Sequence, residues 1–142
     1  MKVAFFTEMG FTGKIPRNHQ NMRTEYSWMC ALDAYHIPIN NNYEGLNNEF
    51  DLGITIIPKK GISAVMLGDY IENNKWFCKK SAVMQEANQT FWQNYTLEEQ
   101  MWYLTTLSES DIIFTHNIKD KRYFEGLINH QFQLLNQDVI FL

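Results

Sequence analysis

Short runs of apolar residues recur along the chain, and polar or turn-forming residues separate them. Runs of about four to eight such residues between turn signals are typical of strands buried in a sheet. We therefore predict six strands, at residues 2–7, 35–39, 51–57, 80–85, 111–115 and 139–142.

Between the strands, the apolar residues follow helical spacing instead. From residue 18 to residue 35, Met22, Tyr26 and Met29 recur every three or four positions, as they would on one face of a helix. We interpret this stripe as part of the core. Further helices are predicted near residues 62–66, at 96–109 and at 119–131.

The helix at 96–109 has a recognisable start. Thr96 and Glu99 have the spacing of a capping box, in which each side chain binds the backbone N–H of the other residue. The apolar face of this helix is predicted to consist of Leu97, Met101, Leu104 and Leu107.

Strands that alternate with helices predict an α/β fold with a mainly parallel sheet and right-handed crossovers. We expect a three-layer Rossmann-like domain with a sheet of about six strands, formed by residues 1–142 as a single domain. This architecture hosts many unrelated activities, so the function has to be argued from the sites.

The clearest candidate site follows the strand at 111–115, which runs directly into His116 and Asn117. Ligands of open α/β sheets bind outside the carboxyl ends of the strands, so His116 is the candidate catalytic residue. Asn117 can bind a ligand or cap the following helix, with Asp120 as an acid in its first turn. Because a helix N-terminus disfavours imidazolium, we predict that His116 is largely neutral at pH 7. The alternative is a histidine bonded only to a loop carbonyl.

The loop after the first strand is a second candidate. Gly10 and Gly13 would let backbone amides approach a phosphate or a sugar, and Lys14 and Arg17 favour an anionic or polyhydroxyl ligand. The loop matches neither a Walker motif nor a dinucleotide fingerprint, so a turn without a ligand stays open as the alternative.

Four more polar residues are candidate ligand contacts. Gln85 and Glu86 follow the strand at 80–85, and they either line the same cleft or bind the neighbouring loop. Arg23 and Glu25 lie one turn into the first long helix, where they reach the cleft or lie on a solvated face.

The composition of the chain argues against several classes of function. The net charge of -4 and the pI near 5.5 carry no general basic footprint, so a nucleic-acid partner is not expected. Cys30 and Cys78 are interpreted as buried thiols in a reducing compartment, and the four histidines show no zinc-ligand spacing. No run approaches the ~20 apolar residues of a membrane span. We expect a cytoplasmic protein with no metal and no bound cofactor.

Several segments together resemble the N-terminal domain of GT-B-type glycosyltransferases. The opening agrees, with the strand at 2–6, the glycine loop and residues 21–25 followed by Trp28. The more specific similarity lies at residues 85–86, 91–95, 100–103, 110–117, 120 and 126–127.

The resemblance implies an enzyme of two Rossmann-like domains that face a cleft. The second domain would bind most of the nucleotide-sugar donor, and the first would supply the acceptor site. His116 is similar to the histidine that lies near the donor sugar in retaining members, and the loop from Gly10 to Gly13 would approach the donor phosphates and the acceptor. The chemistry would be transfer of a sugar to a hydroxyl acceptor, without a bound metal.

The length of 142 residues leaves room for one domain, and no donor-binding half is recognised. We therefore expect an acceptor-side domain that is inactive alone and meets both substrates through a second domain that is missing here, because the transition state would need both walls of the cleft.

Two other hypotheses for the function of the chain stay open. A flavodoxin-like FMN protein fits the length and the acidic charge, and Thr7, Gly10 and Thr12 approach the pattern of a flavin phosphate loop. Met9 stands where that loop needs a second hydroxyl. A non-catalytic binding module is the third class, and exposed cleft surface could then form a homodimer.

Overall fold

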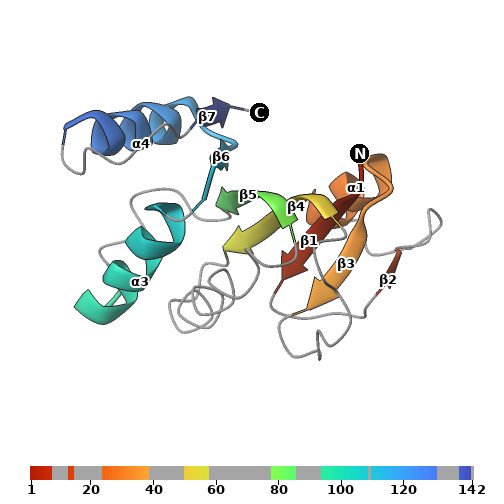
Figure 1. Ribbon diagram of the computed structural model, residues 1–142. Helices are drawn as coiled ribbons and strands as arrows, with labels where there is room; N and C mark the ends of the chain where they lie inside the picture. Colours follow the sequence, from red (N-terminus) through yellow and green to blue (C-terminus); the bar gives the residue numbers. More distant parts are fainter. Residues whose placement is uncertain are drawn as a thin grey trace.

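The sheet of this protein is mainly parallel (Figure 1). The computed structural model describes residues 1–7, 13–14, 24–38, 50–57, 78–85, 94–108, 110–130 and 138–141. In these residues, seven strands form one sheet in the order β2-β3-β1-β4-β5-β6-β7. The strands are β1 Val3–Thr7, β2 Gly13–Lys14, β3 Tyr35–Pro38, β4 Phe50–Ile57, β5 Cys78–Gln85, β6 Ile112–Thr115 and β7 Asp138–Phe141.

All six predicted strands are present, and every pairing among them is parallel. The α/β class and the mainly parallel sheet are therefore confirmed. β2 was not predicted; it is a two-residue strand that pairs antiparallel with β3 at the edge.

Three helices are described: α1 Thr24–Ala31, α3 Leu97–Ser108 and α4 Ile118–His130. Figure 1 shows α1 near β1 and β3, whereas α3 and α4 lie toward the other end of the sheet. The helix predicted at 62–66 and the first part of the one predicted at 18–35 fall outside the described residues.

The predicted end of the first helix, at residue 35, is wrong. The helix ends at Ala31, and Ala34 N–H donates to the carbonyl of Met29 at 2.8 Å. Asp33 adopts a φ of 48°, the left-handed conformation that commonly terminates a helix. This turn frees Tyr35 to begin β3.

Hydrogen bonds between side chains and backbone N–H groups cap α3 and α4. Glu99 N–H donates to Thr96 Oγ1 at 3.2 Å, and Thr96 N–H donates to Glu99 Oε2 at 2.8 Å, so the capping box is confirmed. Asn117 caps α4, as described below.

The predicted apolar face of α3 is partly wrong. Leu97 is 75% exposed and Met101 is 61% exposed, whereas Tyr103 and Leu107 are buried. Tyr103 lies one turn before Leu107, and its ring lies 6.0 Å from that of Tyr95. The helix therefore turns Tyr103 toward the core and leaves Leu97 and Met101 exposed.

The core has one layer on each face of the sheet. On one face, Met29 of α1 packs on a cluster that includes Phe5, Ile54 and Ala82. The alternate strand positions, among them Phe6 and Ile37, form a second cluster on the other face. Strands buried on both faces read as continuous apolar runs, and this is why the sequence pattern located them.

The order of the strands reverses next to β1. The chain passes from β1 through α1 to β3 on one side, whereas β4 lies on the other side of β1. In open α/β sheets this topological switch point is where ligands bind, outside the carboxyl ends of the strands.

Candidate functional site

The carboxyl ends of the six parallel strands lie along one edge of the sheet, which we call the carboxyl edge. Five of its strand-terminal residues are Thr7, Pro38, Ile57, Gln85 and Thr115, from β1, β3, β4, β5 and β6. The predicted catalytic residue follows the last of these directly.

His116 is exposed, and it lies next to Trp28 of α1. The two ring centroids are 6.3 Å apart, and the rings meet edge to face at 83°. Trp28 is half-buried, because part of it packs on the core cluster under α1. The pair combines an imidazole with hydrogen-bonding nitrogens and an apolar indole surface at the same point of the carboxyl edge.

Glu25 belongs to the same region. It is half-buried in the first turn of α1 and precedes Trp28 by three residues, so the two side chains share a helix face. Glu25 therefore lies one turn before the residue of α1 that contacts His116.

Asn117 acts as the cap of α4. Its Oδ1 accepts the N–H of Lys119 at 2.8 Å, and its carbonyl accepts the N–H of Lys121 at 3.0 Å. Asp120 lies in the first turn and is buried, and its part in a capping box stays a prediction. The capping role of Asn117 is confirmed, and its direct role in ligand binding stays a prediction.

Gln85 is the last residue of β5 and pairs with Ile57 of β4. Because Met84 pairs with Phe114, Gln85 is level with Thr115, one residue before His116. The fold therefore places the carboxyl ends of β5 and β6 side by side, and these are the two strands that the sequence predicts to run into polar residues.

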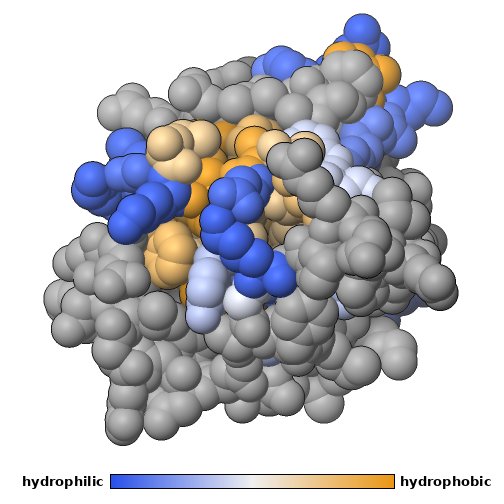
Figure 2. Space-filling view, turned by 90° about the vertical axis from the view of Figure 1, so that its right-hand side faces the viewer, coloured by the Kyte–Doolittle hydropathy of each residue, from blue (hydrophilic) through white to orange (hydrophobic). Residues whose placement is uncertain are grey.

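Lys14 lies farther from this group. It pairs with Tyr35, the first residue of β3, and its Nζ bonds Asp33 Oδ2 at 2.5 Å. Both side chains are exposed, so the ion pair adds little stability, but it holds the ammonium near the end of α1. Figure 2 shows the side of the molecule that carries β2, β3 and α1. On this side, hydrophilic residues lie around an apolar central area and partly over it.

Gly13 begins β2 with a φ of 123°, a conformation that favours glycine. The other candidates, Gly10, Arg17, Arg23 and Glu86, lie outside the described residues.

The carboxyl edge also contains a pair of side chains that the sequence did not indicate. His36 of β3 is fully buried, and its Nε2 lies 2.6 Å from Thr7 Oγ1 at the end of β1. The ring of Tyr26 from α1 meets the imidazole edge-on, with centroids 6.0 Å apart. The sequence could have indicated His36, because it lies between apolar residues within a predicted strand. Its partner Thr7 becomes apparent only from the pairing of β1 with β3.

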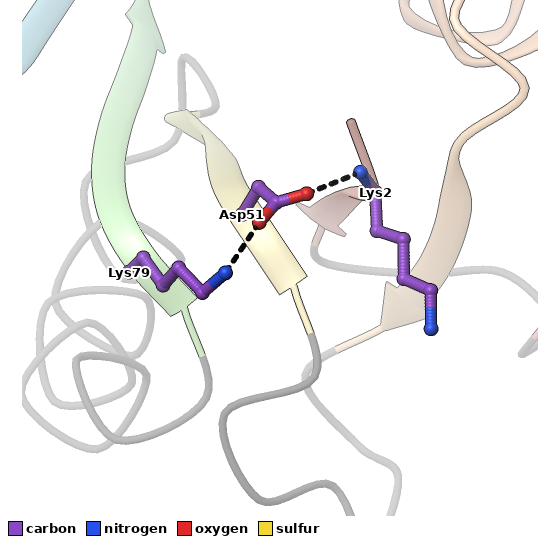
Figure 3. Close-up of polar contacts among 3 residues, drawn as sticks. All are labelled: Lys2, Asp51 and Lys79. Atoms are coloured by element: carbon purple, nitrogen blue, oxygen red, sulfur yellow. Dashed lines mark hydrogen bonds and ion pairs between the residues drawn. The ribbon is translucent and has the colours of Figure 1, made fainter.

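The opposite, amino edge carries charged contacts (Figure 3). Asp51 at the start of β4 accepts Lys79 Nζ of β5 at 2.8 Å and the backbone N–H of Lys2 at 2.8 Å. The Lys2 side chain itself points away from Asp51. The bond from Lys79, and then that from Lys2, holds the pKa of Asp51 below its usual 3.8. These contacts join neighbouring strands far from His116.

Within the described ranges, no cluster of three histidine, cysteine or acidic side chains could hold a metal ion. No helix in the same ranges is both long and apolar enough to cross a membrane.

Comparisons with protein families, curated proteins and solved structures find no match to this chain. We therefore infer the function from the geometry of the carboxyl edge.

Proposed function

We propose that residues 1–142 form the acceptor-side domain of a GT-B-type glycosyltransferase, with His116 at the reaction centre. The observation that carries this proposal is the contact of His116 with Trp28 at the carboxyl edge. Sugars present both hydroxyl groups and apolar C–H faces, and this pair offers a partner for each.

In the proposed reaction, the acceptor hydroxyl oxygen forms a bond to the anomeric carbon of the donor sugar. The bond from that carbon to the diphosphate breaks, the hydroxyl proton passes to a base, and the nucleoside diphosphate leaves. His116 is assigned to hydrogen bonding beside the donor sugar. Turnover would require a second, donor-binding domain, because both walls of the cleft stabilise the transition state.

The substrate-binding set is proposed in two groups. Gln85 and Asn117 support the proposal because they lie beside Thr115 and His116, and Glu25 is included because it lies one turn before Trp28 on α1. The second group is proposed to contact the donor phosphates or the acceptor; it comprises residues of the glycine loop and of the segment before α1, together with the residue that follows β5: Gly10, Gly13, Lys14, Arg17, Arg23 and Glu86.

We also propose the three-layer arrangement that this class of domain has. The crossover from β1 to β3 and the crossover from β5 to β6 run in opposite directions along the sheet. Right-handed crossovers of opposite direction place α1 and α3 on opposite faces. Cys30 and Cys78 form no disulfide, which supports the proposed reducing, cytoplasmic location.

Ligand-observed saturation-transfer NMR tests the proposal, with UDP-glucose and methyl β-glucopyranoside as probes. We expect saturation transfer to at least one probe with the unsubstituted chain, and a reduced signal with His116→Ala and with Trp28→Phe. Lys79→Ala, at the amino edge, is the matched control and should leave the signal unchanged. A signal from neither probe would contradict the proposal, and so would an unchanged signal with His116→Ala.

Catalysis is tested separately. The 142-residue chain alone is expected not to transfer glucose from UDP-glucose. Turnover that survives His116→Ala would contradict the assignment of this histidine.

A flavodoxin-like FMN protein is the second candidate, and the strand order favours it. If the six parallel strands are numbered in chain order, they lie as 2-1-3-4-5-6, which extends the flavodoxin-like order. Against it, the Thr7 hydroxyl that would begin the phosphate loop is buried and bonded to His36. Flavin absorbance in the purified protein, or its appearance on titration with FMN, would favour this candidate over the first.

A further inference from the structure

Most of the large apolar side chains that the described residues expose lie on two helices, α3 and α4. On α3, Leu97 and Met101 are the most exposed of these, as described above. On α4, Ile118 is 44% exposed and Tyr123 is 37% exposed. Single exposed apolar residues are common on protein surfaces, but apolar residues that gather in one exposed area mark interaction sites.

Charged residues accompany these apolar residues, and their sign differs between the two helices. On α3, Glu98 is exposed in the first turn, three residues before Met101 on the same face. On α4, Lys119 and Arg122 are exposed, and Lys119 lies one turn before Tyr123. Within the described part of the chain, Glu98, Lys119 and Arg122 form no ion pair. One helix therefore has an apolar and acidic face, and the other has an apolar and basic face.

Both helices lie on the same side of the sheet. α3 connects β5 to β6 and α4 connects β6 to β7, and these three strands are consecutive in the sheet. Right-handed crossovers that run in the same direction place their helices on the same face, and Figure 1 shows both helices toward the β6–β7 end. The space beside α4 is open, because a Cβ built at Gly126, one turn after Arg122, meets no atom within 4 Å.

A second copy of the chain is the partner that these two faces fit. Within one molecule the faces do not cover each other, since their apolar side chains stay exposed. In a dimer with twofold symmetry, α3 of one protomer can pack on α4 of its partner, and the same contact then forms a second time with the roles exchanged. Each contact joins an acidic face to a basic face and removes apolar side chains from water.

We propose that the chain forms a symmetric dimer in which α3 of each protomer packs against α4 of the other. Glu98 of one protomer faces the basic side chains of Lys119 and Arg122 on its partner, and the exposed apolar residues of the two helices pack together beside them. The dimer needs neither a ligand nor catalysis, so its failure would leave the proposed glycosyltransferase function standing.

Size-exclusion chromatography with light scattering tests the proposal on the 142-residue chain. We expect a mass of twice 16.9 kDa at about 100 µM protein, a concentration at which a micromolar interface is occupied. Glu98→Lys and Lys119→Glu each place like charges across both contacts of the dimer. Each variant alone should therefore associate at least about tenfold more weakly than the unsubstituted chain.

An equimolar mixture of these two variants provides the sharpest readout. In the mixed dimer, one contact has both charges exchanged and the other keeps both original charges, so opposite charges face each other in each contact. The mixture should therefore form dimers although neither variant does so alone. Met101→Ser tests the apolar part of the surface, and it should weaken the dimer while leaving the helix content unchanged in circular dichroism.

Lys2→Glu is the matched control. It changes the net charge as much as Lys119→Glu does, but it lies at the amino edge, where the Lys2 side chain points away from Asp51 (Figure 3). The mass of this variant should equal that of the unsubstituted chain. General repulsion between negatively charged copies predicts instead that Glu98→Lys strengthens association, because that change moves the net charge of -4 toward zero.

Four results would overturn the proposal: a monomeric unsubstituted chain at about 100 µM, a dimer that neither charge reversal weakens, stronger association of Glu98→Lys, or a mixture that stays monomeric. The second of these would show that the copies meet through another surface. Circular dichroism checks that each variant is folded. If Lys119→Glu is not folded, Arg122→Glu replaces it in the same design, because Arg122 lies one turn further along the same face of α4.

Discussion

Gly53, in the middle of β4, occupies a place where no side chain fits. A Cβ at this position would lie 2.5 Å from Cys78 Sγ and 2.9 Å from Phe6 Cε2, both closer than Cβ atoms approach in real structures. Phe6 and Cys78 are themselves buried, so neither can move into solvent. Gly53→Ala should therefore overpack this face of the sheet.

The expected cost follows from two opposing effects. Overpacking a buried site costs about 1–3 kcal/mol. Replacing glycine reduces the entropy of the unfolded chain and returns about 0.4–1 kcal/mol. We expect Gly53→Ala to lower the free energy of unfolding by about 1–2 kcal/mol, which shifts the urea midpoint by roughly 0.5–1 M at a typical slope for a small protein.

A second substitution, at Cys78, tests whether this close contact causes the loss of stability. Cys78→Ala removes the Sγ atom that makes the closest contact, but it leaves the Phe6 ring at 2.9 Å. The double variant Gly53→Ala/Cys78→Ala should thus be more stable than the sum of the single changes predicts, by about 1 kcal/mol. Strictly additive effects, or a stable Gly53→Ala single variant, would refute the packing argument.

Gly126 provides the matched control for this experiment. It lies inside α4, and a Cβ built there meets no atom within 4 Å. Gly126→Ala should raise the free energy of unfolding by about 0.5–1 kcal/mol, because alanine favours a helix interior over glycine. The same substitution is thus expected to have opposite signs at two positions of one protein.

Three further outcomes are expected. The ionised Asp51 carboxylate binds Lys79, so the pKa of Asp51 is lower in the folded chain than in the unfolded chain. The ion pair therefore stabilises the fold at pH values above the pKa of Asp51 in the unfolded chain. This stabilisation is lost as the pH falls through the pKa of Asp51 in the folded chain. The stability difference between the unsubstituted chain and Asp51→Asn should shrink between about pH 5 and pH 2 in urea titrations, and a constant difference would argue against the ion pair. Burial raises the pKa of the Cys78 thiol to about 12, so in native protein at pH 8 Cys78 should react with a thiol reagent far more slowly than it does in urea; equal rates would contradict its burial. Asn117→Ala should lower the free energy of unfolding by about 1 kcal/mol and Asn117→Asp should not, as circular dichroism during urea unfolding can show.

Features governed by neighbours in sequence were predictable. The buried strands appear as apolar runs because both faces of the sheet are covered, and the capping box at Thr96 and Glu99 needs only residues three positions apart. The apolar face of α3 was not predictable in the same way. Apolar spacing permits a stripe through Leu97 and Met101, but in the folded chain α3 buries Tyr103 and Leu107 instead.

The same distinction applies to the candidate site, where one residue could be located from the sequence and its neighbours could not. His116 could be located from the sequence, because the rule for strand ends requires only the strand before it. Its neighbour Trp28 comes from α1, and the bond of Thr7 to His36 depends on the parallel pairing of β1 with β3. Both contacts exist only because the β1–α1–β3 crossover folds back over the switch point. The crossover therefore determines the chemistry of the carboxyl edge: it brings an indole to one histidine and buries the other beneath Tyr26. A histidine of the first kind can meet a ligand, whereas one of the second kind can act only through the backbone it holds.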